Sequence, residues 1–204
     1  KLTKEEIMAA LNERHSPEKQ ALLSEGRVAI AGLGGLGSNV AYALARIGVG
    51  HLHLIDFDVV DITNLNRQQY KASQLGMNKT EALAQNLREI NPFIRLETHA
   101  VRISEENAQE LLQEADVVCE AFDVPEAKAM LVNFVLENMP EKYLVAGSGM
   151  AGFGSPNTIQ TRRITDRFYL CGDTVSDVND GIGLVCARVM VCAAHEAHTI
   201  LRLL

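Results

Sequence analysis

The sequence lacks features that mark several common classes of protein. Its four cysteines, at positions 119, 171, 186 and 192, include no CxxC pair, so no structural zinc is expected. Each cysteine lies in or near an apolar stretch, which favours reduced thiols in a cytoplasmic protein. There is no signal peptide and no apolar run of membrane-spanning length, since the stretch 184–194 is short and contains Arg188. The sequence predicts a soluble protein with no membrane partner.

Positive charge is also scarce. Lys and Arg number 19 against 26 Asp and Glu, which gives a net charge of −7. A protein that binds nucleic acid as its main partner usually presents clustered cations, because binding releases counterions from the phosphate backbone. The balance argues against nucleic acid, and any anion site must be local. The chain has no internal repeat or low-complexity tract, and its 204 residues suit one domain with one core.

Glycine is placed where it indicates a function. An apolar strand beginning at Arg27 runs into Gly32, Gly34 and Gly37, spaced GxGxxG, and an apolar helix pattern follows. Such glycines let the backbone turn tightly and approach a phosphate, while the amino end of the next helix attracts the anion. Glycine-rich turns between a strand and a helix also occur for packing alone, so this motif by itself is weak evidence.

Strand and helix patterns alternate along the chain. An arm of two short helices opens it: Thr3 and Glu6 form a capping box, and Ser16-Pro17 begins the second helix. Beyond the arm the sequence predicts strands over 28–31, 52–56, 94–101, 117–120, 143–146 and 158–162, and helices over 36–47, 78–90, 104–113, 125–138 and 182–203. The segment 163–181 is expected to be flexible. The predicted fold is α/β and Rossmann-like: a mainly parallel twisted sheet with helices on both faces, with the arm over 1–25 and the domain over 26–204.

Polar residues follow several of the predicted strands. Asp56 and Asp58 come after the second strand, Asp123 after the strand at 117–120, and Gly147-Ser148-Gly149 after the strand at 143–146. Ligands bind at the carboxyl ends of parallel strands, so together these residues favour a site, although each acid alone is more often a cap or a solvated loop residue. Asp56 lies 19 positions after Gly37, a spacing that suits a hydrogen bond to a ribose hydroxyl.

Two cations distinguish ATP from a dinucleotide. Arg67 follows Asn64 by three residues, and Lys79 opens a predicted helix. A triphosphate usually recruits Lys, Arg and a metal ion, whereas backbone amides can hold a pyrophosphate. Asp123 could then hold magnesium through its carboxylate and waters. The competing interpretation is that Arg67 and Lys79 are ordinary solvated charges at helix starts.

These motifs together resemble the ThiF/MoeB branch of the ubiquitin-activating-enzyme-like superfamily. The resemblance runs from about residue 26 to residue 154 and rests on GxGGLG at 32–37, DFDxV at 56–60, NLNRQ at 64–68, GxxKxExA at 76–83 and the strand that leads to Asp123. The combination is highly specific, and short ThiF proteins are the most similar members. Many relatives in the family carry paired CxxC motifs for structural zinc, and this chain lacks those pairs.

The resemblance implies an adenylyltransferase. In that family the carboxyl-terminal glycine of a small β-grasp sulfur carrier, ThiS in the thiamine pathway, attacks the α-phosphate of ATP and releases pyrophosphate. By resemblance, Asp56 holds the ribose, Asn64, Arg67 and Lys79 hold the phosphates, and Asp123 binds magnesium. The full set implied to bind ATP is Gly32, Gly34, Gly35, Leu36, Gly37, Asp56, Asp58, Asn64, Arg67, Gln68 and Lys79.

Three further assignments concern residues that no motif fixes. Relatives commonly form homodimers in which an arginine near the amino terminus reaches the neighbour's ATP; Arg14 is the candidate, although a helix-end arginine favoured by the dipole explains it as well. Cys171 is the one cysteine expected in a loop and hence the candidate reactive thiol, while the other three suit core packing. The histidine pairs 51/53 and 195/198 are interpreted as structural.

Other functions remain open from sequence. A related superfamily enzyme activates a different carboxylate, as in the cyclisation of threonylcarbamoyladenosine in tRNA. An oxidoreductase that uses NAD shares the glycine motif, and a scaffold that binds a carrier without turnover keeps the same fold. The salt dependence of tRNA binding tests the first alternative. Calorimetry with NADH against ATP and magnesium tests the second, and carrier binding without pyrophosphate exchange identifies the third.

Overall fold

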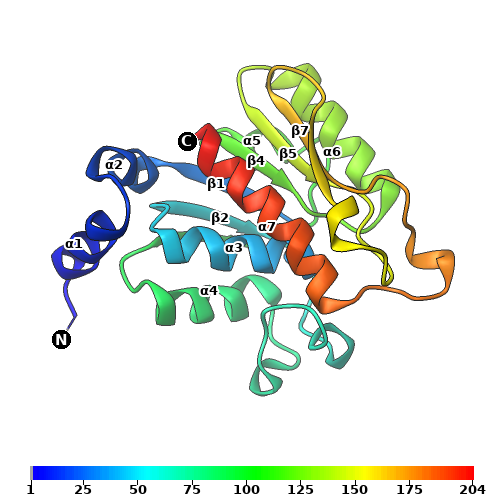
Figure 1. The fold of residues 1–204 in the computed structure, drawn as a ribbon, viewed down its shortest axis with the longest axis horizontal. Helices are drawn as coiled ribbons and strands as arrows, with labels where there is room; N and C mark the ends of the chain where they lie inside the picture. Colours follow the sequence, from blue (N-terminus) through cyan, green and yellow to red (C-terminus); the bar gives the residue numbers. More distant parts are fainter. Residues whose placement is uncertain (1) are drawn as a thin grey trace.

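A seven-stranded sheet forms the centre of the protein in the computed structural model, which describes residues 2–204 (Figure 1). The strand order is β3-β2-β1-β4-β5-β7-β6, and all neighbours pair in parallel except β6 and β7. The strands are β1 (Arg27–Ala31), β2 (His51–Ile55), β3 (Arg95–His99), β4 (Val117–Glu120), β5 (Tyr143–Gly147), β6 (Gln160–Arg163) and β7 (Phe168–Gly172). The helices are α1 (Lys4–Arg14), α2 (Pro17–Glu25), α3 (Gly35–Ile47), α4 (Lys79–Ile90), α5 (Ala108–Leu112), α6 (Pro125–Asn138) and α7 (Cys186–Leu203).

Each face of the sheet has its own core. Successive side chains of a strand point to opposite faces, so Val28 and Ile30 of β1 enter the larger core while Ala29 and Ala31 enter the smaller one. Helices α3, α4 and α7 cover the first face, and α5 and α6 cover the second (Figure 1). The predicted α/β sheet with helices on both faces is confirmed.

The carboxyl-terminal third differs most from the expectation. The segment 163–181 was expected to be flexible, but it contains β7, which pairs with β5 in parallel and with β6 antiparallel. Strand β7 has only five residues and polar residues bound it, so its sequence pattern resembles that of a loop. Its pairing with β5 and β6 is what makes it a strand. Helix α7 begins at Cys186 rather than 182, and the helix expected over 104–113 is confined to α5.

The amino-terminal arm lies beside the starts of β1 and β2. Helix α2 buries Gln20 and Leu23, whereas α1 buries none of its side chains. Gly50 packs so closely on the backbone of Ser24 that a Cβ there would lie 1.7 Å from the Ser24 carbonyl oxygen. The arm is therefore held mainly through α2. Across residues 2–204, no helix combines the length and apolar character that a membrane span requires.

Helix α7 carries a carboxyl group into the core. Glu196 is fully buried, and neither of its carboxyl oxygens has a hydrogen-bond partner within residues 2–204. Burial raises its pKa well above the ordinary value of 4.5, the Lys128 ammonium opposes this rise, and the Glu120 carboxyl adds to it. The neutral acid is thus the form that the folded protein favours.

We expect Glu196→Gln to stabilise the protein at neutral and alkaline pH. When folding raises the pKa of a carboxyl, the protein loses stability as the pH rises above the pKa of that group in the unfolded chain. The loss is roughly 1.4 kcal/mol per pH unit until the pH reaches the pKa of the group in the folded protein. The glutamine has no charge to bury, so the variant should be more stable by about 2 kcal/mol or more at pH 8 and should differ little near pH 4. Urea unfolding at several pH values measures this. The exposed Glu106→Gln is the control, and parallel pH curves for Glu196→Gln and the wild type would contradict the expectation.

Candidate functional site

The carboxyl ends of β1, β2 and β4 meet at one edge of the sheet, at the point where the strand order reverses. Open α/β sheets bind ligands at such a switch point. The loop after β1 touches the segment after β4, because a Cβ on Gly32 would lie 2.7 Å from the carbonyl oxygen of Ala121. The predicted glycine loop and the predicted Asp123 segment are therefore neighbours.

The glycine loop depends on two of its glycines for its shape. Gly32 has φ +92°, a conformation that other residues rarely adopt. At Gly37 a Cβ would lie 1.8 Å from the carbonyl oxygen of Gly32, so the first turn of α3 passes directly against the loop. The N-cap of α3 is Gly34, which has no side chain to cap the helix. The amino-terminal N–H groups and the positive end of the helix dipole face the site without a side-chain acceptor.

Two side chains hold the loop from opposite sides. The carboxylate of Asp56 accepts a hydrogen bond from the Leu33 N–H at 2.7 Å, and its other oxygen accepts one from the Asp58 N–H at 2.8 Å. The Tyr70 hydroxyl donates to the Leu33 carbonyl oxygen at 2.7 Å. Burial raises the pKa of Tyr70, so the hydroxyl keeps its proton. Asp56, predicted as a ribose ligand, is also the brace of the glycine loop.

The segment from Asn64 to Gln68 lies over the glycine loop. A Cβ on Gly35 would lie 3.5 Å from Cγ of Arg67. The guanidinium donates to the Thr63 carbonyl oxygen at 3.1 Å and to Asn66 at 2.8 Å, while its Nε is buried and has no hydrogen-bond partner among residues 2–204. Part of the Arg67 fork is thus available to an acceptor. Asn64 itself caps a short helical turn, since its Oδ1 accepts from the Asp61 N–H at 2.9 Å.

Gln68 and Lys79 complete the polar lining on this side. The Gln68 side-chain nitrogen lies 3.6 Å from where a Cβ of Gly34 would stand, and its Oε1 is buried without a hydrogen-bond partner in the described chain. Lys79 begins α4 and is 6% exposed, and its Nζ pairs with the Asp58 carboxylate at 3.1 Å. Asp58 is half exposed. A buried ammonium with one exposed carboxylate partner is suited to exchange that partner for an incoming anion.

Asp123 is exposed at the end of a segment that a buried ion pair holds. Glu120, at the end of β4, is fully buried and pairs with Nζ of Lys128 at 2.8 Å. It also accepts a hydrogen bond from the Phe122 N–H at 2.7 Å, and Lys128 donates to the Phe122 carbonyl oxygen at 3.0 Å. Burial raises the pKa of Glu120, and the Lys128 ammonium opposes the rise. The pair fixes the turn that presents Asp123.

The sequence matches the ThiF family over residues 7–202. The chain belongs to the ThiF family. The resemblance found in its motifs is confirmed, and the match extends beyond them into the arm and the last helix.

Curated ThiF-family relatives include larger proteins. The adenylyltransferase and sulfurtransferase UBA4 of Lodderomyces elongisporus is 36% identical over 136 residues, which are 66% of this chain and 30% of that protein. The tRNA threonylcarbamoyladenosine dehydratase of Haemophilus influenzae is 34% identical over 158 residues, which are 76% of this chain and 60% of that protein. The chain therefore spans between about a third and two thirds of these relatives.

Solved structures share the fold of this ThiF-family chain. The E. coli tRNA threonylcarbamoyladenosine dehydratase TcdA, in complex with ATP, aligns with a TM-score of 0.87 at 23% identity and covers 99% of this chain and 96% of its own. E. coli MccB with ATP aligns with a TM-score of 0.69 at 24% identity, over 91% of this chain and 58% of its own. At these identities the likeness establishes the fold.

Cys171 is not in a loop, contrary to the expectation. It lies in β7, is fully buried, and burial raises its pKa to about 12. A reactive thiol needs a lowered pKa and access to solvent, so this thiol in its present surroundings suits packing. The loop placement was wrong because β7 itself was not recognised, and a reactive role for Cys171 stays a prediction.

Arg14 ends α1 and is exposed. Residues of α1 line a small cavity of about 100 Å³ with Gly48, His51 and Phe93, at the amino-terminal edge of the sheet. The glycine loop lies at the carboxyl-terminal edge of the same strands. Within one protomer Arg14 is thus at the far edge from the glycine loop, and a role across a dimer interface stays a prediction.

Sequence reasoning did not find three of the residues that shape the site. Glu120 and Lys128 are eight positions apart, in a strand and a helix, and Tyr70 lies 37 positions from the carbonyl it holds. A charged residue that ends an otherwise apolar strand was the available signal for Glu120. Nothing local distinguishes Lys128 or Tyr70 from surface residues of a helix and a loop.

Proposed function

We propose that the chain transfers an adenylyl group from ATP to the carboxyl-terminal glycine of a small ubiquitin-like sulfur carrier, similar to ThiS, in thiamine or related sulfur-transfer biosynthesis. Membership of the ThiF family supports this, as do curated relatives named as adenylyltransferases and sulfurtransferases. The observation that carries the proposal is the convergence of the uncapped amino end of α3, Arg67 and Lys79 at one edge of the sheet.

Each group has a role that its contacts suggest. The amino end of α3 and the unpartnered Nε of Arg67 receive phosphate oxygens, and Lys79 exchanges Asp58 for another phosphate oxygen. Asp56 remains able to accept a ribose hydroxyl, because each carboxylate oxygen has a second lone pair. The cations neutralise charge that develops on the phosphate oxygens as the carrier carboxylate attacks the α-phosphorus and pyrophosphate leaves.

Magnesium fits the donor chemistry at Asp123. Mg²⁺ prefers hard oxygen ligands and commonly takes one or two carboxylates together with waters and phosphate oxygens. Asp123 offers an exposed carboxylate on a turn that Glu120 and Lys128 hold rigid. When bound, the ion would neutralise phosphate charge, which is the chemistry that it supplies in phosphoryl and adenylyl transfer.

We expect Asp123→Asn to lower carrier-dependent exchange of pyrophosphate into ATP by about 10²-fold, because the site loses the charge that recruits magnesium. The assay uses the whole chain with ThiS-like carriers and a magnesium series. Asp166→Asn, at a carboxylate that is 98% exposed on another loop, is the matched control. Full activity of Asp123→Asn would contradict this role, and no exchange with any β-grasp carrier would count against the proposed substrate.

A modified tRNA base is the second candidate substrate. The favouring observation is the 34% identity to the tRNA threonylcarbamoyladenosine dehydratase of Haemophilus influenzae over 158 residues, which are 76% of this chain. The net charge of −7 opposes it, since tRNA binding requires a basic surface. Measuring tRNA affinity as a function of salt separates the candidates. Tight binding with a steep salt slope favours tRNA, and carrier-dependent exchange without it favours the sulfur carrier.

Calorimetry addresses the two remaining alternatives. An oxidoreductase should bind NADH in preference to ATP with magnesium, and the reverse result favours the adenylyltransferase. A non-catalytic scaffold should bind a carrier while remaining inactive in pyrophosphate exchange.

A homodimer completes the proposal. Arg14 lies at the opposite edge of the sheet from the glycine loop, so it reaches a nucleotide only across an interface with a second copy. Sedimentation at several protein concentrations tests the dimer. Mixing Arg14→Ala with Arg67→Ala should restore part of the exchange activity if each copy supplies one arginine.

A further inference from the structure

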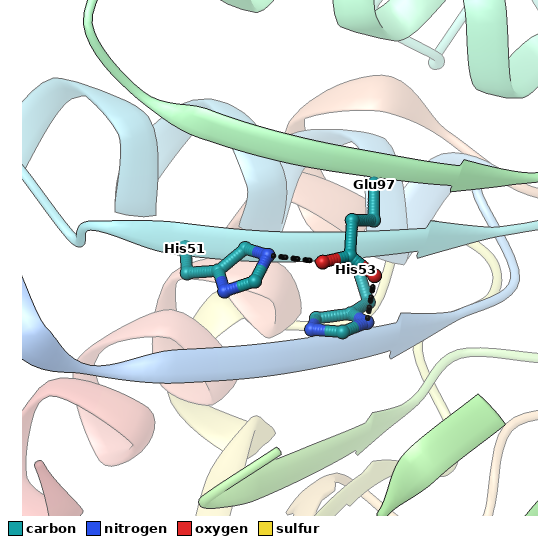
Figure 2. Close-up of side chains that lie close together, drawn as sticks. All are labelled: His51, His53 and Glu97. Atoms are coloured by element: carbon teal, nitrogen blue, oxygen red, sulfur yellow. Dashed lines mark ion pairs between the residues drawn. The ribbon is translucent and has the colours of Figure 1, made fainter. Parts of the chain in front are cut away.

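Three histidines surround one carboxylate on β2 and β3, away from the proposed nucleotide site. His53 pairs in register with Glu97, and His51 lies two residues earlier on the same face of β2. His99 lies two residues after Glu97 on the same face of β3. Figure 2 shows the rings of His51 and His53 directed at the two oxygens of Glu97.

The distances suit a shared metal ion. Nε2 of His51 lies 3.0 Å from Oε1 of Glu97, Nδ1 of His53 lies 3.4 Å from Oε2, and Nε2 of His99 lies 3.9 Å from Oε2. One ligand atom from each of His51, His53 and Glu97 can be chosen so that all lie within 4.8 Å of one another. Tetrahedral Zn²⁺ with bonds near 2.0 Å separates its ligand atoms by about 3.3 Å, so small side-chain rotations bring these atoms into place.

The environment of the rings also points to a ligand. His53 is 3% exposed, and Nε2 of His99, the nitrogen that faces Glu97, is buried without a hydrogen-bond partner within residues 2–204. Glu97 is half exposed, so an ion can enter from solvent.

We propose that His51, His53 and Glu97 bind a divalent transition metal ion, Zn²⁺ in the first instance, with His99 or a water as the fourth ligand. Nitrogen and carboxylate ligands of this kind suit zinc and exclude a preference for Mg²⁺ or Ca²⁺. At about 3.3 Å per residue along β2, His53 lies about 10 Å and His51 about 16 Å from Asp56, so this ion is separate from one at the nucleotide edge. The bound ion would link the edge strand β3 to its neighbour β2.

This proposed zinc site uses histidine ligands, so the lack of paired cysteines does not exclude it. Zinc was not expected because the cysteines are unpaired, and the two histidines in alternation on one strand were interpreted as structural. Only the register of β2 with β3 brings Glu97 and His99 to them. The competing explanation is an ion pair in which a protonated histidine neutralises Glu97, and it predicts no metal affinity.

Calorimetric titration of the tag-free, chelator-treated protein with Zn²⁺ tests the site. We expect one ion per chain with micromolar or tighter affinity, no comparable binding of Mg²⁺, and a rise in Tm of about 5 °C at saturating zinc. Co²⁺ should give the visible absorption of a four-coordinate ion. Anomalous scattering from a zinc-soaked crystal should place the ion between β2 and β3.

The variants Glu97→Gln and His51→Gln should each weaken zinc binding by at least tenfold. Both positions retain some exposure, so folding should survive. His198→Gln on α7 and Glu89→Gln, which removes an exposed carboxylate of another ion pair, are the matched controls and should bind zinc as the wild type does. Unchanged affinity in Glu97→Gln and His51→Gln, or no saturable zinc binding by the wild type below 0.1 mM (roughly −5.5 kcal/mol), would overturn the proposal.

Discussion

Replacing Arg67 by alanine should lower carrier-dependent exchange of pyrophosphate into ATP by about 10²- to 10³-fold. Arg67 lies against Gly35 and presents a buried, unpartnered Nε beside the glycine loop. Loss of a fixed donor that binds charge developing in the transition state typically costs this much. Folding should persist, because within residues 2–204 the guanidinium bonds only to Thr63 and Asn66 of its own segment.

Arg67→Lys separates charge from geometry. Lysine keeps the positive charge but lacks the planar fork, so we expect activity between those of the wild type and the alanine variant. Arg163→Ala removes an exposed arginine from the β6–β7 hairpin and should leave exchange unchanged. Arg67→Ala with wild-type exchange and wild-type ATP affinity would remove Arg67 from the proposed site.

Gly37→Ala should be among the most damaging single substitutions in the chain. The added Cβ would lie 1.8 Å from the Gly32 carbonyl oxygen, and both atoms belong to backbone that cannot move independently. The start of α3 must then shift away from the loop. We expect a loss of more than about 4 kcal/mol in the free energy of unfolding and no detectable nucleotide binding, measured by urea unfolding and calorimetry.

The same loop provides the control. At Gly34 a Cβ would make ordinary contact with Gln68 at 3.6 Å, and Gly34 has a negative φ of −80°. Gly34→Ala should therefore keep most of the stability that Gly37→Ala loses, although it stands beside the proposed nucleotide. Equal stability of the two variants would mean that the loop relaxes freely.

Most of the fold follows from local pattern. Strands β1, β4 and β5 are mainly apolar and lie between helical patterns, so their order and type are predictable. β7 was missed because five residues bounded by Arg167 and Asp173 resemble a loop until β5 and β6 pair with them. Long-range pairing of this kind leaves no periodic trace in the sequence.

The candidate site divides in the same way. The glycine loop, Asp56 and Lys79 are found from spacing, since strand ends in a parallel sheet converge by topology. Tyr70 holds the glycine loop, and the pair of Glu120 with Lys128 holds the turn before Asp123, but these contacts arise only in the folded chain. The sequence shows His51 and His53 in alternation on one strand. Only the register of β2 with β3 places Glu97 beside them.

Leu33 is tied through both its N–H and its carbonyl oxygen, by Asp56 and Tyr70. The proposed anion site is consequently preorganised before any ligand arrives, and its rigidity belongs to the native state. Nucleotide association should then forfeit little chain entropy, because no disordered segment has to settle. Removing the tyrosine hydroxyl, as in Tyr70→Phe, should make the entropy of association more unfavourable without altering the groups that contact phosphate.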